Sequence, residues 1–313
     1  MATQPRILVI KHSALGDFIQ AMGPFAAIRA HHKDARITLL TTKPYAEMGR
    51  ICPYFDEVWT DPLPKAWDVT GMMKLRRLLR SVKFDMVYDL QTSERSNSYF
   101  HTMGDPPWSG IAHGCEYFHA NHDRDLMHVM ERQTEQLAMA GIPETPSPDL
   151  SWLDADLSAL HPPKRFVLMA PGGAAHRPHS RWPSDRFAAL GNLLGLKGIS
   201  TVVLGTRLDH DAIKVIVGNC PTAMSLADRT PFAVIAALAR KALGAVGNDT
   251  GPMQLIAAAG CPSVVLFSAE TDPAVCAPRG AVACLQNESL TDLPVENVAA
   301  ALESGPAALR EAA

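Results

Sequence analysis

The stretch Gly247-Asn248-Asp249-Thr250-Gly251-Pro252-Met253-Gln254 decides how this chain folds. It follows an apolar run at 242–246, which predicts a buried strand, and it precedes one at 255–259, which predicts a helix. Thr250 is a candidate cap for that helix, and Pro252 suits its first turn, where no N–H is needed. Backbone amides and the helix dipole at such a turn favour an anion. The stretch therefore predicts either a phosphate site or an ordinary capped helix, and it does not by itself separate the two.

Composition limits the classes of protein to which this chain can belong. The 313 residues are enough for two domains, and with 47% hydrophobic and 19% charged residues a large core is expected. The net charge of −3 gives no field that would attract nucleic acid, so no nucleic-acid partner is expected. The six cysteines form no C-x-x-C pair, which argues against zinc ribbons and disulfide frameworks. We see no signal peptide and no membrane-spanning run, so a cytoplasmic protein without a transmembrane segment is expected.

Strands and helices alternate along the whole chain, which predicts parallel α/β sheets. Strands are predicted at 6–11, 36–42, 57–60, 84–90, 109–112, 165–169, 201–204, 242–246 and 263–267. Helices are predicted at 17–30, 74–83, 133–140, 184–194, 209–217, 231–238 and after Pro294. A proline-rich stretch at 142–164 interrupts the alternation and predicts a linker. We therefore expect two domains, 1–155 and 163–313, with ligands beyond the carboxyl ends of their strands.

Four stretches in order resemble glycosyltransferase family 9, the ADP-heptose:lipopolysaccharide heptosyltransferases. They are Lys11-His-Ser-Ala-Leu-Gly-Asp17, Tyr88-Asp-Leu-Gln91 followed by Arg95, Ser180-Arg-Trp-Pro183, and Asn248-Asp-Thr-Gly-Pro-Met253 with Ala257-Ala-Ala-Gly260. The resemblance implies an α/β GT-B fold, in which two Rossmann-like domains with parallel sheets face a central cleft. The last helix is a candidate to pack back on the N-terminal domain.

The resemblance also implies the reaction. A heptose would pass from ADP-heptose, held by the C-terminal domain, to a lipopolysaccharide inner-core acceptor held by the N-terminal domain. Transfer would invert the anomeric carbon and need no metal or other cofactor. The enzyme would work in the cytoplasm, where it meets its acceptor at the inner-membrane surface, and peripheral attachment to that membrane is left open.

Asp17 matches the family's catalytic aspartate, which takes the proton of the attacking hydroxyl. From the residues alone, a role for Asp17 as a cap of the first helix is favoured over catalysis. Gly16 is expected to supply a positive φ or room for a close approach. The implied acceptor-binding residues are Ser13, Gly16, Gln91, Arg95 and His128.

On the donor side, the resemblance implies a nucleotide-sugar site made largely of loop residues. Its members are Gly172, Arg181, Thr206, Asp249, Thr250, Gly251, Pro252, Met253 and Gln254. The backbone at 250–252 is expected to face the ADP phosphates. Asp249 would repel phosphate, so it is expected to orient the loop or meet a sugar hydroxyl. Arg181 is expected to neutralise charge on the leaving ADP.

Three positions depart from the family pattern. Gln254 stands where histidine is common, and Ser180 stands where a lysine is usual, so Arg181 or Arg177 would have to replace that lysine. Arg207 lies in a region that usually offers an acidic residue to the ribose. A GT-B enzyme with another nucleotide sugar or acceptor therefore stays open, as does a non-catalytic nucleotide-sugar-binding protein. The Gly16-Asp17 pair argues against the latter, since binding alone does not need that carboxylate.

Two further patterns receive a structural interpretation. His113, His119 and His122 have no common zinc spacing, so no metal site is expected. The basic amphipathic stretch 74–83 can attract anionic headgroups or a phosphorylated acceptor, but an ordinary surface helix is favoured.

Overall fold

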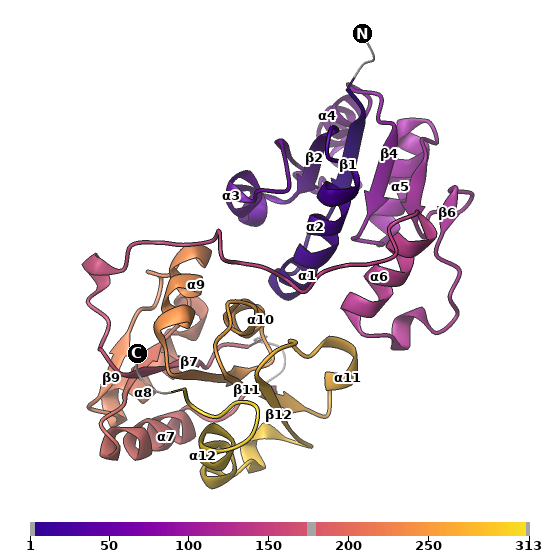
Figure 1. The fold of residues 1–313 in the computed structure, drawn as a ribbon. Coiled ribbons are helices and arrows are strands. Elements are labelled where there is room, and N and C mark those ends of the chain that lie inside the picture. The colour runs from indigo at the N-terminus through magenta and orange to yellow at the C-terminus, as the bar shows by residue number, and fades with distance from the viewer. Residues whose placement is uncertain (1–3, 174–179, 311–313) are drawn as a thin grey trace. The chain divides into compact units, whose positions relative to one another are not determined.

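The computed structural model describes residues 4–173 and 180–310, and the chain divides into two compact units, Met1–Trp152 and Leu153–Ala313. We call them unit 1 and unit 2. Each contains one six-stranded parallel sheet flanked by helices, as Figure 1 shows. This is the α/β architecture that the alternation of strands and helices predicted.

The sheet of unit 1 has the strand order β3-β2-β1-β4-β5-β6. Its strands are β1 Arg6–Ile10, β2 Arg36–Thr41, β3 Glu57–Thr60, β4 Met86–Asp89, β5 Trp108–Gly110 and β6 Tyr117–Phe118. Five of these strands were predicted. The sixth, β6, has only two residues at the sheet edge, too few to show any alternation of apolar and polar side chains.

The helices of unit 1 correct two predictions. They are α1 Leu15–Gln20, α2 Met22–His31, α3 Lys43–Ile51, α4 Val69–Leu79, α5 Glu94–Met103 and α6 Val129–Met139. The single helix predicted at 17–30 is wrong: it is two helices that meet at Ala21, because Pro24 has no N–H for the carbonyl of Gln20. The helix predicted at 74–83 begins earlier and ends at Leu79, since Asp68 caps its start by accepting the Gly71 amide at 2.8 Å.

The sheet of unit 2 has the order β12-β11-β10-β7-β8-β9. Its strands are β7 Phe166–Ala170, β8 Ser200–Val203, β9 Ala223–Ser225, β10 Gly244–Asn248, β11 Ser263–Ser268 and β12 Val282–Asn287. Its helices are α7 Ser184–Leu196, α8 His210–Asn219, α9 Phe232–Lys241, α10 Gly251–Ala258, α11 Pro273–Cys276 and α12 Val295–Glu303. The unpredicted strands β9 and β12 are half-exposed edge strands, which lack the continuous apolar run of a buried strand.

The core of unit 2 places α12 within that unit. Val298 and Leu302 of α12 are buried in the same cluster as Leu190 and Leu194 of α7. Trp182 lies in this core and its indole nitrogen donates to the Leu293 carbonyl at 2.9 Å. The last helix therefore packs against α7 of its own unit.

Candidate functional site

The loop between β10 and α10 leaves the sheet at its carboxyl edge, and α10 begins at Gly251 with Pro252 in its first turn. The predicted side-chain cap is wrong: the Thr250 hydroxyl donates to the Asn248 carbonyl at 3.2 Å. The Thr250 carbonyl accepts the amides of Met253 at 3.1 Å and Gln254 at 3.3 Å. Among the described residues the Gly251 amide has no acceptor. That N–H, at the start of the helix, is the group of this turn best suited to an anion.

Asn248, the last residue of β10, holds this loop to two others. Its carboxamide oxygen accepts the Trp182 amide at 3.0 Å, and its nitrogen donates to the carbonyls of Pro171 at 2.9 Å and Gly172 at 3.0 Å. The side chain is fully buried. One amide thus fixes the loop after β10 to both ends of the connection between β7 and α7. The sequence analysis included this asparagine in the predicted loop but assigned it no role.

Gly247 allows these elements to approach. A Cβ atom at this position would lie 2.8 Å from both the Ala170 carbonyl oxygen and the Met253 sulfur. Met253 itself is fully buried, so it packs beneath the loop. Gln254 is also buried, and its side-chain nitrogen donates to the Cys276 carbonyl at 2.7 Å, which ties α10 to α11. The structure thus gives both residues a contact that shapes the loop.

The segment 180–183 borders the same loops. Arg181 is half-buried and donates from Nη2 to the Gly173 carbonyl. The Ser180 hydroxyl meets the Ser268 hydroxyl at 2.7 Å and donates to a Glu270 carboxylate oxygen at 2.9 Å. Ser180 is therefore held in a polar cluster at the end of β11. The alternative cation, Arg177, lies outside the described residues.

Thr206 follows β8 and caps a short turn. Its partner in this cap is an acidic residue to which the sequence analysis gave no role. Its amide and hydroxyl donate to one oxygen of Asp209, at 2.9 and 3.1 Å. Asp209 is nearly buried, and a Cβ atom at Gly172 would lie 3.0 Å from its other oxygen. The loops after β7 and β8 therefore meet at this carboxylate. Arg207 is not acidic, but an acid stands two residues further along the chain.

In unit 1, Asp17 lies in the first turn of α1, close to where β1 ends. Its carboxylate accepts the Ala14 amide at 3.4 Å and is half-exposed. Gly16 lies in the same turn with a helical φ, so the expected positive φ is wrong there. Asp17 is thus held beside a loop, with one face open to a ligand.

The loop that precedes Asp17 is held by Gln91, which follows β4. The side-chain oxygen of Gln91 accepts the amides of His12 at 2.9 Å and Ser13 at 3.2 Å. Thr42, after β2, donates its hydroxyl to the His12 carbonyl at 2.7 Å. Gln91 and Ser13, two of the predicted acceptor-binding residues, thus lie in contact, and their contact fixes the path of the loop.

The other two predicted acceptor residues have structural contacts. Arg95 donates from Nη2 to the Pro64 carbonyl at 2.9 Å, which holds the segment that precedes α4. His128 is buried at the start of α6, where its Nδ1 accepts the Met130 amide at 3.2 Å.

The sequence analysis missed a group of buried charges near Asp17. Lys11 is 3% exposed and donates from Nζ to the Leu90 carbonyl at 3.1 Å. Burial lowers the pKa of Lys11 to about 8. The positive charges of Arg132 and Arg124 lower this pKa further, whereas the carboxylates of Asp17 and Asp89 raise it. Burial likewise lowers the pKa of Arg124 to about 10. Lone charges at strand ends and in loops give no periodic signal, so only the fold reveals this cluster.

Burial also raises the pKa of Asp89 to about 6, although this carboxylate accepts the amides of Thr92 at 2.9 Å and Gln91 at 3.0 Å. Arg124 is 8% exposed, donates to the Thr92 hydroxyl at 2.9 Å, and has a buried Nε without a partner among the described residues. Buried cations with unused donors are suited to an anionic ligand.

A second buried cluster lies under the same loop. His12 is 3% exposed, and its Nε2 lies 3.3 Å from an Asp61 oxygen. The Tyr99 hydroxyl donates to the same oxygen at 2.5 Å. Burial lowers the pKa of His12 to about 4, although Asp61 raises it. His12 is therefore neutral at pH 7 and serves to support the loop.

Replacing His12 with glutamine should weaken the acid dependence of stability. Because the pKa of His12 is lowered from 6.5 to about 4 in the folded protein, the unfolded chain takes up the proton first. Its contribution is thus present above pH 6.5 and is lost as the pH falls towards 4. Between pH 7 and pH 5 the wild type should lose about 2 kcal/mol more unfolding free energy than His12→Gln. Urea unfolding at both pH values measures this difference.

The control is His113→Gln, an exposed histidine in the loop between β5 and β6. Its acid dependence should equal that of the wild type. Equal acid dependence of the His12→Gln variant and the wild type would show that His12 is not the group responsible.

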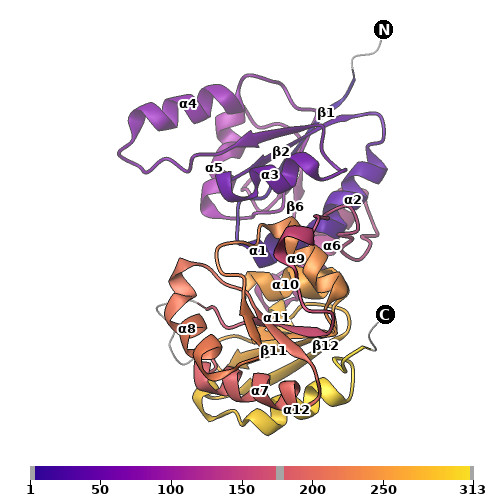
Figure 2. The same ribbon diagram turned by 90° about the vertical axis from the view of Figure 1, so that its left-hand side faces the viewer.

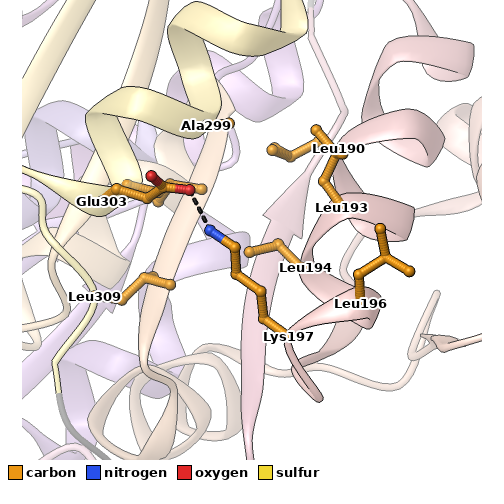
Figure 3. A pocket seen from close by; sticks show the side chains of 9 residues that line it. Leu190, Leu193, Leu194, Leu196, Lys197, Ala299, Glu303 and Leu309 are labelled. Carbon is orange, nitrogen blue, oxygen red and sulfur yellow. Dashed lines mark hydrogen bonds and ion pairs between the residues drawn. The ribbon is translucent and has the colours of Figure 1, made fainter.

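Figure 3 shows an apolar pocket of about 170 Å³ in unit 2, lined by α7, α12 and Leu309. Lys197 and Glu303 form an ion pair across it. None of the predicted site residues lines this pocket. Its leucine-rich wall offers few polar partners for a nucleotide, so we assign it no ligand.

Residues 4–173 and 180–310 contain neither a candidate metal site nor a candidate membrane-spanning helix. No three histidine, cysteine or acidic side chains come together there as a possible metal site. The histidines His113, His119 and His122 therefore form no such group. No helix there combines the length and the apolar character needed to cross a bilayer.

The chain is similar to known proteins over most of its length. The family model described as glycosyltransferase family 9 (heptosyltransferase) matches residues 72–292, more than half of the chain. Lipopolysaccharide heptosyltransferase 2 of Escherichia coli (strain K12) is 27% identical over 290 residues, which cover 84% of this chain and 82% of that protein.

Solved structures show the same fold. A glycosyl transferase family 9 protein from Veillonella parvula DSM 2008 has a TM-score of 0.84 at 19% identity, over 96% of each chain. The E. coli ADP-heptose lps heptosyltransferase II has a TM-score of 0.78 at 22% identity, over 95% of this chain and 97% of that one. The predicted GT-B fold class, with two Rossmann-like parallel α/β units, is confirmed.

Proposed function

The chain belongs to glycosyltransferase family 9 and is a glycosyltransferase, and from that premise we propose that it moves a heptose from ADP-heptose to a lipopolysaccharide inner-core acceptor. In this proposal transfer inverts the anomeric carbon and needs no metal. Unit 2 holds the donor, and unit 1 supplies the base and binds the acceptor. The enzyme works at the cytoplasmic face of the inner membrane, where such an acceptor is available.

The observation that supports this proposal most is the fixed loop between β10 and α10. Asn248 binds both ends of the connection between β7 and α7, and α10 begins with the unpaired Gly251 amide at the carboxyl edge of the sheet. A diphosphate fits such a site because helix N-termini favour anions. Arg181, beside Gly173, would meet the charge that develops on the leaving ADP.

Asp17 is the proposed base. As the acceptor hydroxyl oxygen attacks the anomeric carbon, the bond from that carbon to the β-phosphate oxygen breaks and ADP leaves with the bonding electrons. The hydroxyl proton passes to the Asp17 carboxylate. The Ala14 amide holds one carboxylate oxygen, so Asp17 keeps a fixed orientation and the other oxygen is available for the proton.

The acceptor is proposed to carry an anionic group near Asp17. Lys11 and Arg124 are buried cations there, and the Arg124 Nε has no partner within the described part of the chain. Gln91 and Ser13 line the loop between β1 and α1. Asp89 and Asp17 offset part of this positive charge, and an acceptor phosphate or carboxylate would pair with the donors that remain.

A second candidate is a family member with a different nucleotide sugar. Two observations favour it. Ser180 is engaged with Ser268 and Glu270, where a lysine would serve phosphate, and Arg207 stands where an acid would serve ribose. Asp209 can supply that acid through its second oxygen, because both capping bonds from Thr206 go to the first.

Calorimetric titration with ADP, UDP and GDP distinguishes the two candidates. We expect tighter binding of ADP than of UDP or GDP, and no loss of affinity after chelation of divalent metals. Tighter binding of UDP or GDP would overturn the ADP-heptose assignment. A strict requirement for magnesium would overturn the metal-free mechanism.

A further inference from the structure

We propose that residues 62–83 of unit 1 form a docking surface for an anionic lipid bilayer. We call this surface the α4 face. The docking proposal rests on the proposed function in one respect: a lipid-linked acceptor would be reached at this surface. The α4 face contains the apolar residues Trp67, Val69, Met72 and Met73 and the basic residues Lys65, Lys74, Arg76, Arg77, Arg80 and Lys83.

The apolar residues of the α4 face are unusually exposed. Trp67 is 77% exposed, Val69 66%, Met73 67% and Met72 45%. Single exposed apolar side chains are ordinary on a protein surface, but a contiguous group that includes a tryptophan marks an interaction site. These four side chains lie within one short stretch at the start of α4, so they form one group.

Helix geometry explains why Val69 and Met73 cannot turn inward. Leu75 and Leu79 of α4 are buried against the sheet of unit 1, which fixes the rotation of the helix. Val69 and Met73 lie four residues apart and so share a different side of α4. Asp68 caps the helix, so Trp67 stands just before its first turn. Figure 2 shows α4 along the outside of unit 1, which leaves that side uncovered within the unit.

The charge of the α4 face is strongly positive. Six basic residues and one acidic residue, Asp68, lie between positions 62 and 83, whereas the whole chain has a net charge of −3. Within the described parts of the chain, none of the six cations forms an ion pair. Lys65 has its Nζ 5.1 Å from the centre of the Trp67 ring. These charges are therefore uncompensated and complement an anionic partner.

The order of the residues favours a bilayer over other anions. Trp67, Val69 and Met73 precede Arg76, Arg77 and Arg80, and Arg76 and Arg80 continue the side of the helix that begins with Val69 and Met73. Apolar side chains can enter the interface while the guanidinium groups meet phosphate headgroups. A soluble phosphate or nucleotide would leave Trp67 and Met73 in water.

The test is sedimentation with vesicles of phosphatidylcholine, with and without phosphatidylglycerol. We expect the full chain to bind only the vesicles that contain phosphatidylglycerol, and to dissociate at about 1 M salt, where the Debye length is about 3 Å. Removal of three charges in R76Q/R77Q/R80Q should lower the partition constant about a hundredfold, at about fivefold per cation. The W67S/M73S variant should lower it roughly tenfold.

The matched controls are K33Q/R50Q/K214Q, which has the same net charge as the arginine variant, and L196S/V215S, which removes two exposed apolar side chains elsewhere. Both should bind like the wild type. Absence of wild-type binding, or equal loss in variants and controls, would overturn the proposal. Titration with ADP reports on the donor site separately, so the docking surface and the transferase function can fail independently.

Discussion

Replacing Asp17 with asparagine should lower turnover by about 10²–10⁴-fold, the usual contribution of a general base. Asparagine keeps the size of the side chain and can still accept the Ala14 amide, which the carboxylate now accepts at 3.4 Å. It cannot take a proton from the acceptor hydroxyl. ADP affinity, measured by calorimetry, should therefore stay at the wild-type value while the rate of sugar transfer falls.

Asp34→Asn provides the matched control, since Asp34 is an exposed carboxylate in the turn between α2 and β2 of the same unit. Its turnover should equal that of the wild type. If Asp17→Asn retains turnover within a few-fold of the wild type, the base assignment is wrong. Loss of ADP binding in the same variant would instead point to a structural role.

Replacing Asn248 with alanine should destabilise unit 2 by about 3 kcal/mol or more and weaken ADP binding. The substitution removes both partners of a buried network: the acceptor of the Trp182 amide and the donor to the carbonyls of Pro171 and Gly172. Each backbone group left without a partner costs about 1–3 kcal/mol. Thermal unfolding and calorimetry with ADP measure the two effects.

Asn248→Asp tests the donor side of this network. Aspartate can still accept the Trp182 amide, but it cannot donate to the Pro171 and Gly172 carbonyls and would face them with a buried charge. It should therefore be as damaging as alanine. Asn192→Ala, which removes an exposed amide bound to the Asn219 carbonyl at 2.9 Å, should cost less than about 1 kcal/mol. Equal stability of the Asn248 and Asn192 variants would contradict the account.

The fold could be predicted because its strands are buried on both faces. β10 and β11 are fully buried, and such strands give continuous apolar runs. Glycine and proline residues mark the ends of these runs. The edge strands β6, β9 and β12 are half-exposed and give no such run. Helix ends were less predictable, because a single proline, Pro24, divides one apolar pattern into α1 and α2.

The candidate site was predictable only in its loops. The stretch around Asn248 and the stretch that ends at Asp17 stand at strand-to-helix junctions, which sequence patterns mark. The contacts that shape these loops come from distant positions: Gln91 reaches His12, and Asn248 reaches Trp182. Such pairings depend on strand order, so the burial of Lys11 could not be inferred from its neighbours in the chain.

The most direct test of the proposed function is nuclear magnetic resonance of the product formed from ADP-heptose and a lipopolysaccharide inner-core acceptor in the presence of a chelator. We expect one new glycosidic bond per ADP released, with the anomeric configuration opposite to that of the donor. A product with retained configuration, or release of ADP without a new bond to the acceptor, would contradict inverting, metal-independent heptosyl transfer by this protein.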